Sequence, residues 1–222
     1  MQAILDDGLT LQVHRRLRHD LLQGRIAPGT KLKVQALGAA YGAGASPVRE
    51  ALSSLASEGL VQRIDGRGFR AAPATVEDFD ELVRARCWLE EVVLRESIAA
   101  GGPAWEDALV VARWRLARIP RSGSTGGFAP NPDWEAAHTA FHRALLAGCP
   151  SSTLRDMAET LRERAERYRA LANRIAYPGR DVAAEHEAIA EAALARDAPR
   201  AVALLQAHYR TTAGFLRDAL AG

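Results

Sequence analysis

The strongest constraint on the fold is a change of pattern at Pro73. After this residue, apolar side chains recur every three or four positions through long segments, and none of these segments shows the alternation of a half-buried strand. The helical patterns cover residues 76–100, 104–119, 132–147, 152–175, 181–196 and 198–221. Helices of this kind bury their apolar faces against one another, so residues 76–222 are predicted to form an all-α antiparallel bundle.

The first 73 residues have a different organisation, with short helical patterns separated by turns. These patterns cover residues 10–23, 34–41 and 46–58. Ser46 can cap the third helix through its side chain. Pro47 suits the first helical position, because the N–H that proline lacks would have no partner there. The stretch "GLVQRIDGRGFRAAP" predicts two short strands around an Asp65-Gly66 turn. Helix, helix, turn, helix and hairpin, in this order, predict a winged helix-turn-helix domain over residues 1–73 of a mainly α chain.

Composition argues against a membrane or secreted protein. No apolar run approaches the roughly 20 residues needed to span a bilayer. The segment "MQAILDDGLTLQ" has two acids where a signal peptide has a basic region, so we expect a cytoplasmic protein without a membrane partner. Cys87 and Cys149 lack the paired spacing of zinc sites and disulfide frameworks, and we expect reduced thiols.

The charge is divided unevenly along the chain. Residues 1–73 contain ten Lys or Arg against six Asp or Glu, whereas the remainder contains 19 against 21. The first part therefore has a formal charge of +4 and the second part −2. A basic winged helix-turn-helix domain is expected to bind double-stranded DNA.

The stretch "SPVREALSSLASEGLV", from Ser46 to Val61, resembles the signature helix of the GntR family of bacterial transcription regulators, and "GRGF" resembles the wing of that family. The resemblance implies that Ser46 and Arg49 contact the major groove. It also implies that Gly66 and Arg67 approach the minor groove or the backbone. Arginine can bind guanine or phosphate, and glycine permits a close backbone approach. The alternative for Arg49 is an exposed ion pair with Glu50.

This chain departs from the family pattern at several positions. Gly44 and Ala45 stand where many members have a serine and an arginine, and Gln35 stands where an arginine is frequent. Fewer cationic contacts predict a shallower salt dependence of DNA binding. Arg49 is therefore the first candidate for DNA contact, and the weaker candidates are Gln35, Lys31 and Lys33.

Four of the six histidines lie in the helical part: His138, His142, His186 and His208. The first two are four residues apart and share a helix face, and the other two lie on later helices. Helices of a bundle can bring such residues together around a metal ion. Taken singly, each histidine is more often a surface or hydrogen-bonded core residue. Imidazole suits several divalent ions, zinc, nickel, copper and iron among them.

The helical part is similar to the six-helix FCD effector domain of the FadR subfamily. The motifs are "RCWLE", "FHRAL", "EHEAI" and the late "AHYR". The resemblance implies an effector-binding, metal-binding and dimerisation domain that holds a divalent ion, zinc first, on three histidines and an acidic residue. In this chain His138 stands at the acidic position, so a set of four nitrogen ligands is predicted.

Effectors of this family are commonly small organic acids, which need a cationic partner in the protein. Arg86 is the first candidate, because it projects from an apolar stripe formed with Leu82, Leu89 and Val93. The alternative is a structural ion pair between Arg86 and Glu90, one helical turn away. Arg143 is a weaker candidate for the effector carboxylate.

These predictions combine into a dimeric, ligand-responsive transcription regulator, which we expect to be a repressor released from DNA by a small carboxylate. A direct metal-ion sensor is the first alternative. A metal-dependent hydrolase is the second, and it is disfavoured because "HExxH" and "GxSxG" are absent from the sequence. We therefore do not expect an enzyme.

Overall fold

A computed structural model describes residues 2–22, 24–64, 66–125 and 127–221. The chain divides into two compact units, with a boundary between Thr75 and Val76, and each unit is described by itself. Asp65 of the predicted turn and Gln23 at the end of the first predicted helix lie outside the described residues.

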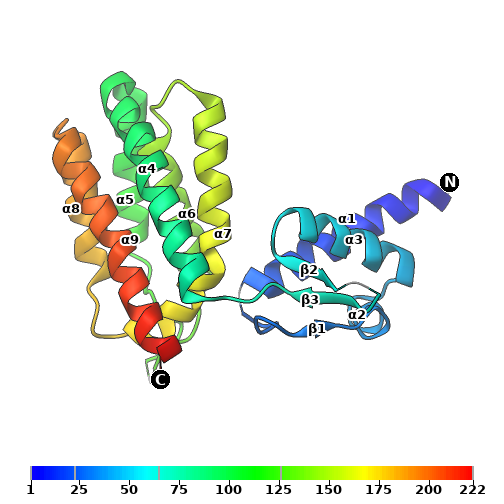
Figure 1. Ribbon diagram of the computed structural model, residues 1–222. Helices are drawn as coiled ribbons and strands as arrows, with labels where there is room; N and C mark the ends of the chain where they lie inside the picture. Colours follow the sequence, from blue (N-terminus) through cyan, green and yellow to red (C-terminus); the bar gives the residue numbers. More distant parts are fainter. Residues whose placement is uncertain (1, 23, 65, 126, 222) are drawn as a thin grey trace. The chain divides into compact units, whose positions relative to one another are not determined.

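The first unit consists of helices α1 to α3 and a small antiparallel sheet (Figure 1). Its helices are α1 (Gln2–Leu22), α2 (Val34–Tyr41) and α3 (Ala45–Ser57), and its strands are β1 (Lys31–Leu32), β2 (Val61–Ile64) and β3 (Gly68–Ala71). The strand order is β1-β3-β2. The predicted winged helix-turn-helix fold is confirmed, and β1 is an additional two-residue strand that the sequence pattern did not reveal.

The core of the first unit forms between α1, α3 and the sheet. Leu17 on α1 and both Leu52 and Leu55 on α3 are fully buried. Phe69 on β3 packs into the same cluster, opposite Leu32 on one neighbouring strand and Arg63 on the other. This packing fixes the hairpin beside α3, because burying Phe69 requires the sheet face to point at the helix.

One prediction about α3 is wrong. The helix begins at Ala45, with Gly44 at the N-cap in an extended conformation, and no side chain caps it. Ser46 is thus inside the first turn, where its hydroxyl donates to Glu50 Oε1 at 3.2 Å. Pro47 tolerates this shift, since every N–H in the first turn lacks an intrahelical acceptor.

The second unit is built of long helices packed side by side (Figure 1). They are α4 (Val76–Ala100), α5 (Pro103–Ala117), α6 (Pro132–Leu146), α7 (Ser152–Ala176), α8 (Val182–Leu194) and α9 (Ala198–Ala221). Their ends differ from the predicted ones by at most two residues, and the predicted helical bundle is confirmed. Among the described residues, no helix combines the length and apolar character that crossing a membrane would require.

Side-chain caps explain where three of these helices begin. The side chains of Asn131, Ser151 and Asp181 accept hydrogen bonds from first-turn backbone N–H groups of α6, α7 and α8, respectively. Such caps satisfy donors that have no partner within the helix. The caps therefore fix where α6, α7 and α8 begin.

Candidate nucleic-acid interface and candidate metal centre

In the first unit, α3 and the β2–β3 hairpin form the two sides of a shallow groove. Its lining includes Arg49, Ser53, Arg63, Gly66, Gly68 and Phe69. The groove brings together a helix and a hairpin turn, both of which can contact a duplex. Ser53 and Arg63 were not predicted from the sequence. The available signals were the spacing of four residues between Arg49 and Ser53 and the cross-strand position of Arg63.

All five residues predicted to contact DNA are exposed: Gln35, Ser46, Arg49, Gly66 and Arg67. Ser46 and Arg49 lie nearly one turn apart at the start of α3. Gly66 has φ of +62° and Gly68 has φ of +97°, so both positions require a backbone that favours glycine. The Glu50 carboxylate accepts hydrogen bonds from Ser46 and Thr10. Between the described residues Arg49 and Glu50 no ion pair forms.

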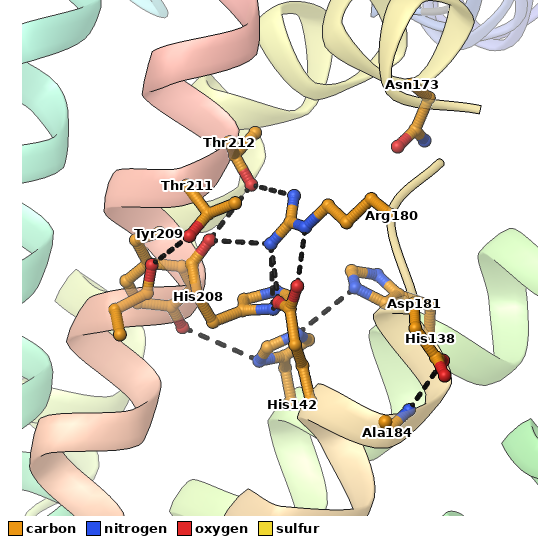
Figure 2. A network of polar contacts seen from close by, with 12 residues as sticks. His138, His142, Asn173, Arg180, Asp181, Ala184, His208, Tyr209, Thr211 and Thr212 are labelled. Atoms are coloured by element: carbon orange, nitrogen blue, oxygen red, sulfur yellow. Dashed lines mark hydrogen bonds and ion pairs between the residues drawn. The ribbon is translucent and has the colours of Figure 1, made fainter. Parts of the chain in front are cut away.

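In the second unit, the four histidines converge. His138 and His142 come from α6, His186 from α8 and His208 from α9, and all four are buried. One ring nitrogen from each lies within 4.8 Å of the others. The Nε2 atoms of His138 and His142 are 3.2 Å apart (Figure 2). The sequence indicated only that a bundle can bring these four histidines together, and the structure shows that it does.

The donor set fits a transition-metal ion. Zinc–nitrogen distances of about 2.0–2.1 Å place two tetrahedral nitrogens about 3.3 Å apart, close to the separation of His138 from His142. Burial lowers the pKa of His142 well below its usual value, and positive charge on His186 or His208 would lower it further. Neutral imidazoles with available lone pairs are what a metal ion requires.

A carboxylate and an arginine support His208. Its Nδ1 is 2.6 Å from Glu185 Oε2, and Arg180 donates to both Glu185 oxygens at 2.7 and 2.6 Å. Burial opposes ionisation of Glu185, but the hydrogen bonds from His208 and Arg180 outweigh it and lower the pKa of Glu185 to about 2. The carboxylate is therefore ionised at neutral pH.

A second buried network surrounds His142. Tyr209 donates to Glu90 Oε2 at 2.5 Å, and its hydroxyl is 3.5 Å from His142 Nδ1. Arg86 donates to Glu90 Oε1 at 2.7 Å, and its guanidinium lies 3.9 Å from the centroid of the Tyr209 ring. The structure thus has the Arg86–Glu90 ion pair that the sequence left open as an alternative.

Two cavities adjoin the histidine cluster. The first, of about 210 Å³, has a lining that includes Arg113, Arg121, Trp134, Tyr177, Arg180 and His186. The second, of about 280 Å³, has a lining that includes Glu90, His142, Arg143, Arg155, Glu159 and Arg162. The first is the more cationic, because its arginines outnumber its acids.

Several of these residues escaped prediction from the sequence. Arg121 lies in the loop between α5 and α6, and its Nη2 donates to Asn173 Oδ1 on α7 at 2.7 Å. Arg180 lies between α7 and α8. Loop positions carry no helical periodicity, so nothing in the pattern marked these two arginines. Glu185 had one available signal, its position next to His186 in "EHEAI".

The first unit presents an exposed recognition helix and a wing, and the second holds a buried histidine cluster, as in transcription regulators with a helical sensor domain. Residues 9–70 match the profile of "Bacterial regulatory proteins, gntR family", and residues 81–211 match that of the "FCD domain". The chain belongs to the GntR family and has an FCD domain. It is a transcription regulator and not an enzyme.

Curated relatives and solved structures agree with this assignment. The chain is 35% identical to the HTH-type transcriptional regulator BphR of Paraburkholderia xenovorans, over 92% of this chain and 83% of the relative. It is 31% identical to the HTH-type transcriptional repressor GlaR of Escherichia coli, over 96% and 98%. The structure of E. coli McbR/YncC matches its fold with a TM-score of 0.76 and 21% identity, over 96% and 98%. FCD domains commonly bind metal, and the histidine cluster could hold an ion.

Proposed function

We propose that this protein is a cytoplasmic, dimeric repressor of the FadR subfamily, which leaves its operator when a small carboxylate binds beside a metal ion. His138, His142, His186 and His208 would hold the ion, with zinc first and nickel second. The ion would supply a Lewis-acidic centre for the carboxylate. GlaR, which aligns with nearly the whole chain, is named a repressor, and this supports repression that is released by the ligand.

The observation that carries this proposal is the placement of an arginine-lined cavity against a cluster of four buried histidines. A divalent ion on four imidazoles keeps both positive charges, whereas a carboxylate ligand would cancel one of them. Arg113, Arg121 and Arg180 also line the cavity, but Arg113 is paired with Glu187 and Arg180 with Glu185, so the ion itself would supply most of the positive field. A small anion is therefore the ligand that the cavity would favour.

The predicted contact between Arg86 and the effector remains part of the proposal. In the structure Arg86 is paired with Glu90, so contact with an effector carboxylate would require exchange of that partner. Arg121 is the simpler partner for the effector carboxylate, because it lines the cavity and its partner Asn173 is uncharged. Both arginines are therefore worth testing against the same ligands.

The response would travel through the helices that hold the ion. The histidines on α6, α8 and α9 would connect three helices through the metal ion. An anion bound to this ion can therefore change how the three helices pack. In a dimer, such a change would alter the separation of the two DNA-binding domains. Half-sites about one helical turn apart do not tolerate a different separation, and operator affinity would fall.

The experiment uses protein purified without a histidine tag. Elemental analysis measures the metal content, light scattering measures the oligomeric state, and a DNA site is selected from a random pool. Fluorescence anisotropy then measures DNA affinity against mono-, di- and tricarboxylates, with metal-loaded and chelator-treated protein. About one ion per chain and carboxylate-dependent release only from loaded protein would support the proposal.

Two results would contradict the proposal. Protein that takes up neither zinc nor nickel would remove the metal site, and the DNA-binding function would then stand alone. Release from DNA by the metal alone, without any carboxylate, would instead identify a direct metal-ion sensor.

A further inference from the structure

The bonding of His208 assigns its two ring nitrogens different roles. Nδ1 is 2.6 Å from the Glu185 carboxylate, an acceptor that requires a proton on the nitrogen. Arg180 Nη2 is also 3.2 Å from Nδ1, but its two N–H groups donate to Glu185 Oε2 and to the His208 carbonyl oxygen at shorter distances, so the contact with the carboxylate decides the position of the proton. A neutral imidazole has one N–H, so protonation of Nδ1 leaves Nε2 with the available lone pair. Carboxylates commonly fix the tautomer of a metal-binding histidine in this way.

The Glu185 carboxylate is itself held in place. Arg180 donates to its two oxygens through Nε and Nη2, in the forked geometry that fits a carboxylate. The same guanidinium donates to Thr212 Oγ1 and to the His208 carbonyl oxygen, both at 2.8 Å. In Figure 2 the Arg180 side chain points from the segment between α7 and α8 towards these two residues on α9.

These contacts close a ring across two helices. Glu185 on α8 holds the imidazole of His208 on α9, and Arg180 contacts both the carboxylate and the backbone of His208. The side chain of Arg180 is 6% exposed, so little water competes for its hydrogen bonds. Such a ring restricts both the rotation of the imidazole and its distance from the neighbouring histidines.

We propose that Glu185, oriented by Arg180, is a positioning residue that fixes His208 in the Nδ1–H tautomer and presents Nε2 to the metal. This inference rests on the metal site of the proposed function. It adds two residues that do not belong to the ligand set, one of which, Arg180, also lines the cationic cavity.

The test compares Glu185→Ala and Glu185→Gln with Glu191→Gln in the full-length protein. Glu191 is an exposed acid on the same helix, so its substitution removes the same charge from α8 without touching the cluster. Zinc affinity is measured by competition with a chelator. Two-dimensional ¹H–¹⁵N spectra of the histidine rings, in metal-free protein, report the tautomer of His208.

We expect Nδ1–H in the wild type and in Glu191→Gln. In Glu185→Ala the Nε2–H form should appear, and the zinc dissociation constant should rise about 10- to 100-fold. Glu185→Gln keeps an acceptor oxygen and should show an intermediate loss, which separates positioning from a general defect in folding.

Wild-type zinc affinity in both Glu185 variants, or a His208 tautomer that is unchanged in Glu185→Ala, would overturn the inference. Failure of the proposed function is distinguishable from this result. A wild-type protein that binds no metal would refute the metal site, while the tautomer in metal-free protein would still decide the role of Glu185.

Discussion

The two candidate sites of this protein differ in where their functional groups lie. The residues predicted to contact DNA are all exposed on one helix, its neighbour and a hairpin turn, whereas the four histidines are all buried. An exposed side chain is solvated until DNA binds, and removing it leaves the fold unchanged. A buried polar side chain must already be satisfied by its neighbours, so its removal also disturbs them.

The two sites also differ in how solvent acts on their charges. Contacts between exposed arginines and phosphates are screened by salt, because counterions compete for both partners. Charges in the buried networks around His142 and His208 are screened much less. Salt should therefore weaken DNA binding strongly and metal binding weakly, and each of the following substitutions acts on one side of this contrast.

The largest effect is expected at His142. His142→Ala removes a central ligand, and zinc affinity should fall by at least about 100-fold, more than a supporting residue would cost. The matched control is His19→Ala, which removes an exposed histidine of the first unit. Chelator competition measures both. Equal affinities for wild type and His142→Ala would place the metal elsewhere.

The next effect is expected at Arg49. Arg49→Ala should weaken binding to the selected DNA site about 10- to 100-fold, which corresponds to losing one specific arginine contact. The melting temperature should not change, because the side chain is exposed. Arg70→Ala serves as the control, since Arg70 projects from β3 on the face opposite Phe69. A similar loss in both variants would show that only the total charge matters.

A smaller effect is expected at Gln35, where the substitution adds a DNA contact and does not remove one. Gln35→Arg restores a cation near the start of α2, and it should steepen the dependence of log affinity on log salt by about 0.9. Between 50 and 200 mM salt the variant should therefore lose roughly three- to four-fold more affinity than the wild type. Gln62→Arg adds the same charge on β2. An equal slope in both variants would rule out a phosphate contact at position 35.

The smallest effect concerns Glu159, which pairs with Arg143 and Arg162 beside the second cavity. Burial opposes its ionisation, but the hydrogen bonds from Arg162 and Arg143 outweigh it and lower the pKa of Glu159 to about 2. A lowered pKa stabilises the folded state above the ordinary value near 4.5, and this contribution is lost as the pH falls towards 2.

Glu159→Gln should therefore reduce the free energy of unfolding by about 0.5 kcal/mol at pH 7, a value that allows for solvent screening. Much of this difference should vanish by pH 3. Urea titration followed by tryptophan fluorescence is a suitable measurement, because all four tryptophans lie after residue 76. A difference that is the same at both pH values would mean that the pair acts by packing and not by charge.

Much of the fold followed from the sequence because its signals are local. Apolar periodicity placed α4 and α9 at their observed ends, and the Asp65-Gly66 dipeptide placed the hairpin turn between β2 and β3. The start of α3 was predicted two residues late, since a glycine N-cap leaves no side-chain signal. Strand β1 was missed because a two-residue strand has no periodicity and exists only through its pairing with β3.

The sequence by itself determined the classes of element, the basic first part and the four histidines that could meet. Only the tertiary structure decided that they do meet, because their helices are joined by packing between distant segments. It also shows Arg86 paired with Glu90 and lying over the ring of Tyr209, whereas the spacing alone only allowed the pair. The support of His208 by Glu185 and Arg180 arises in the same way, from contacts between a loop and two helices that no local pattern encodes.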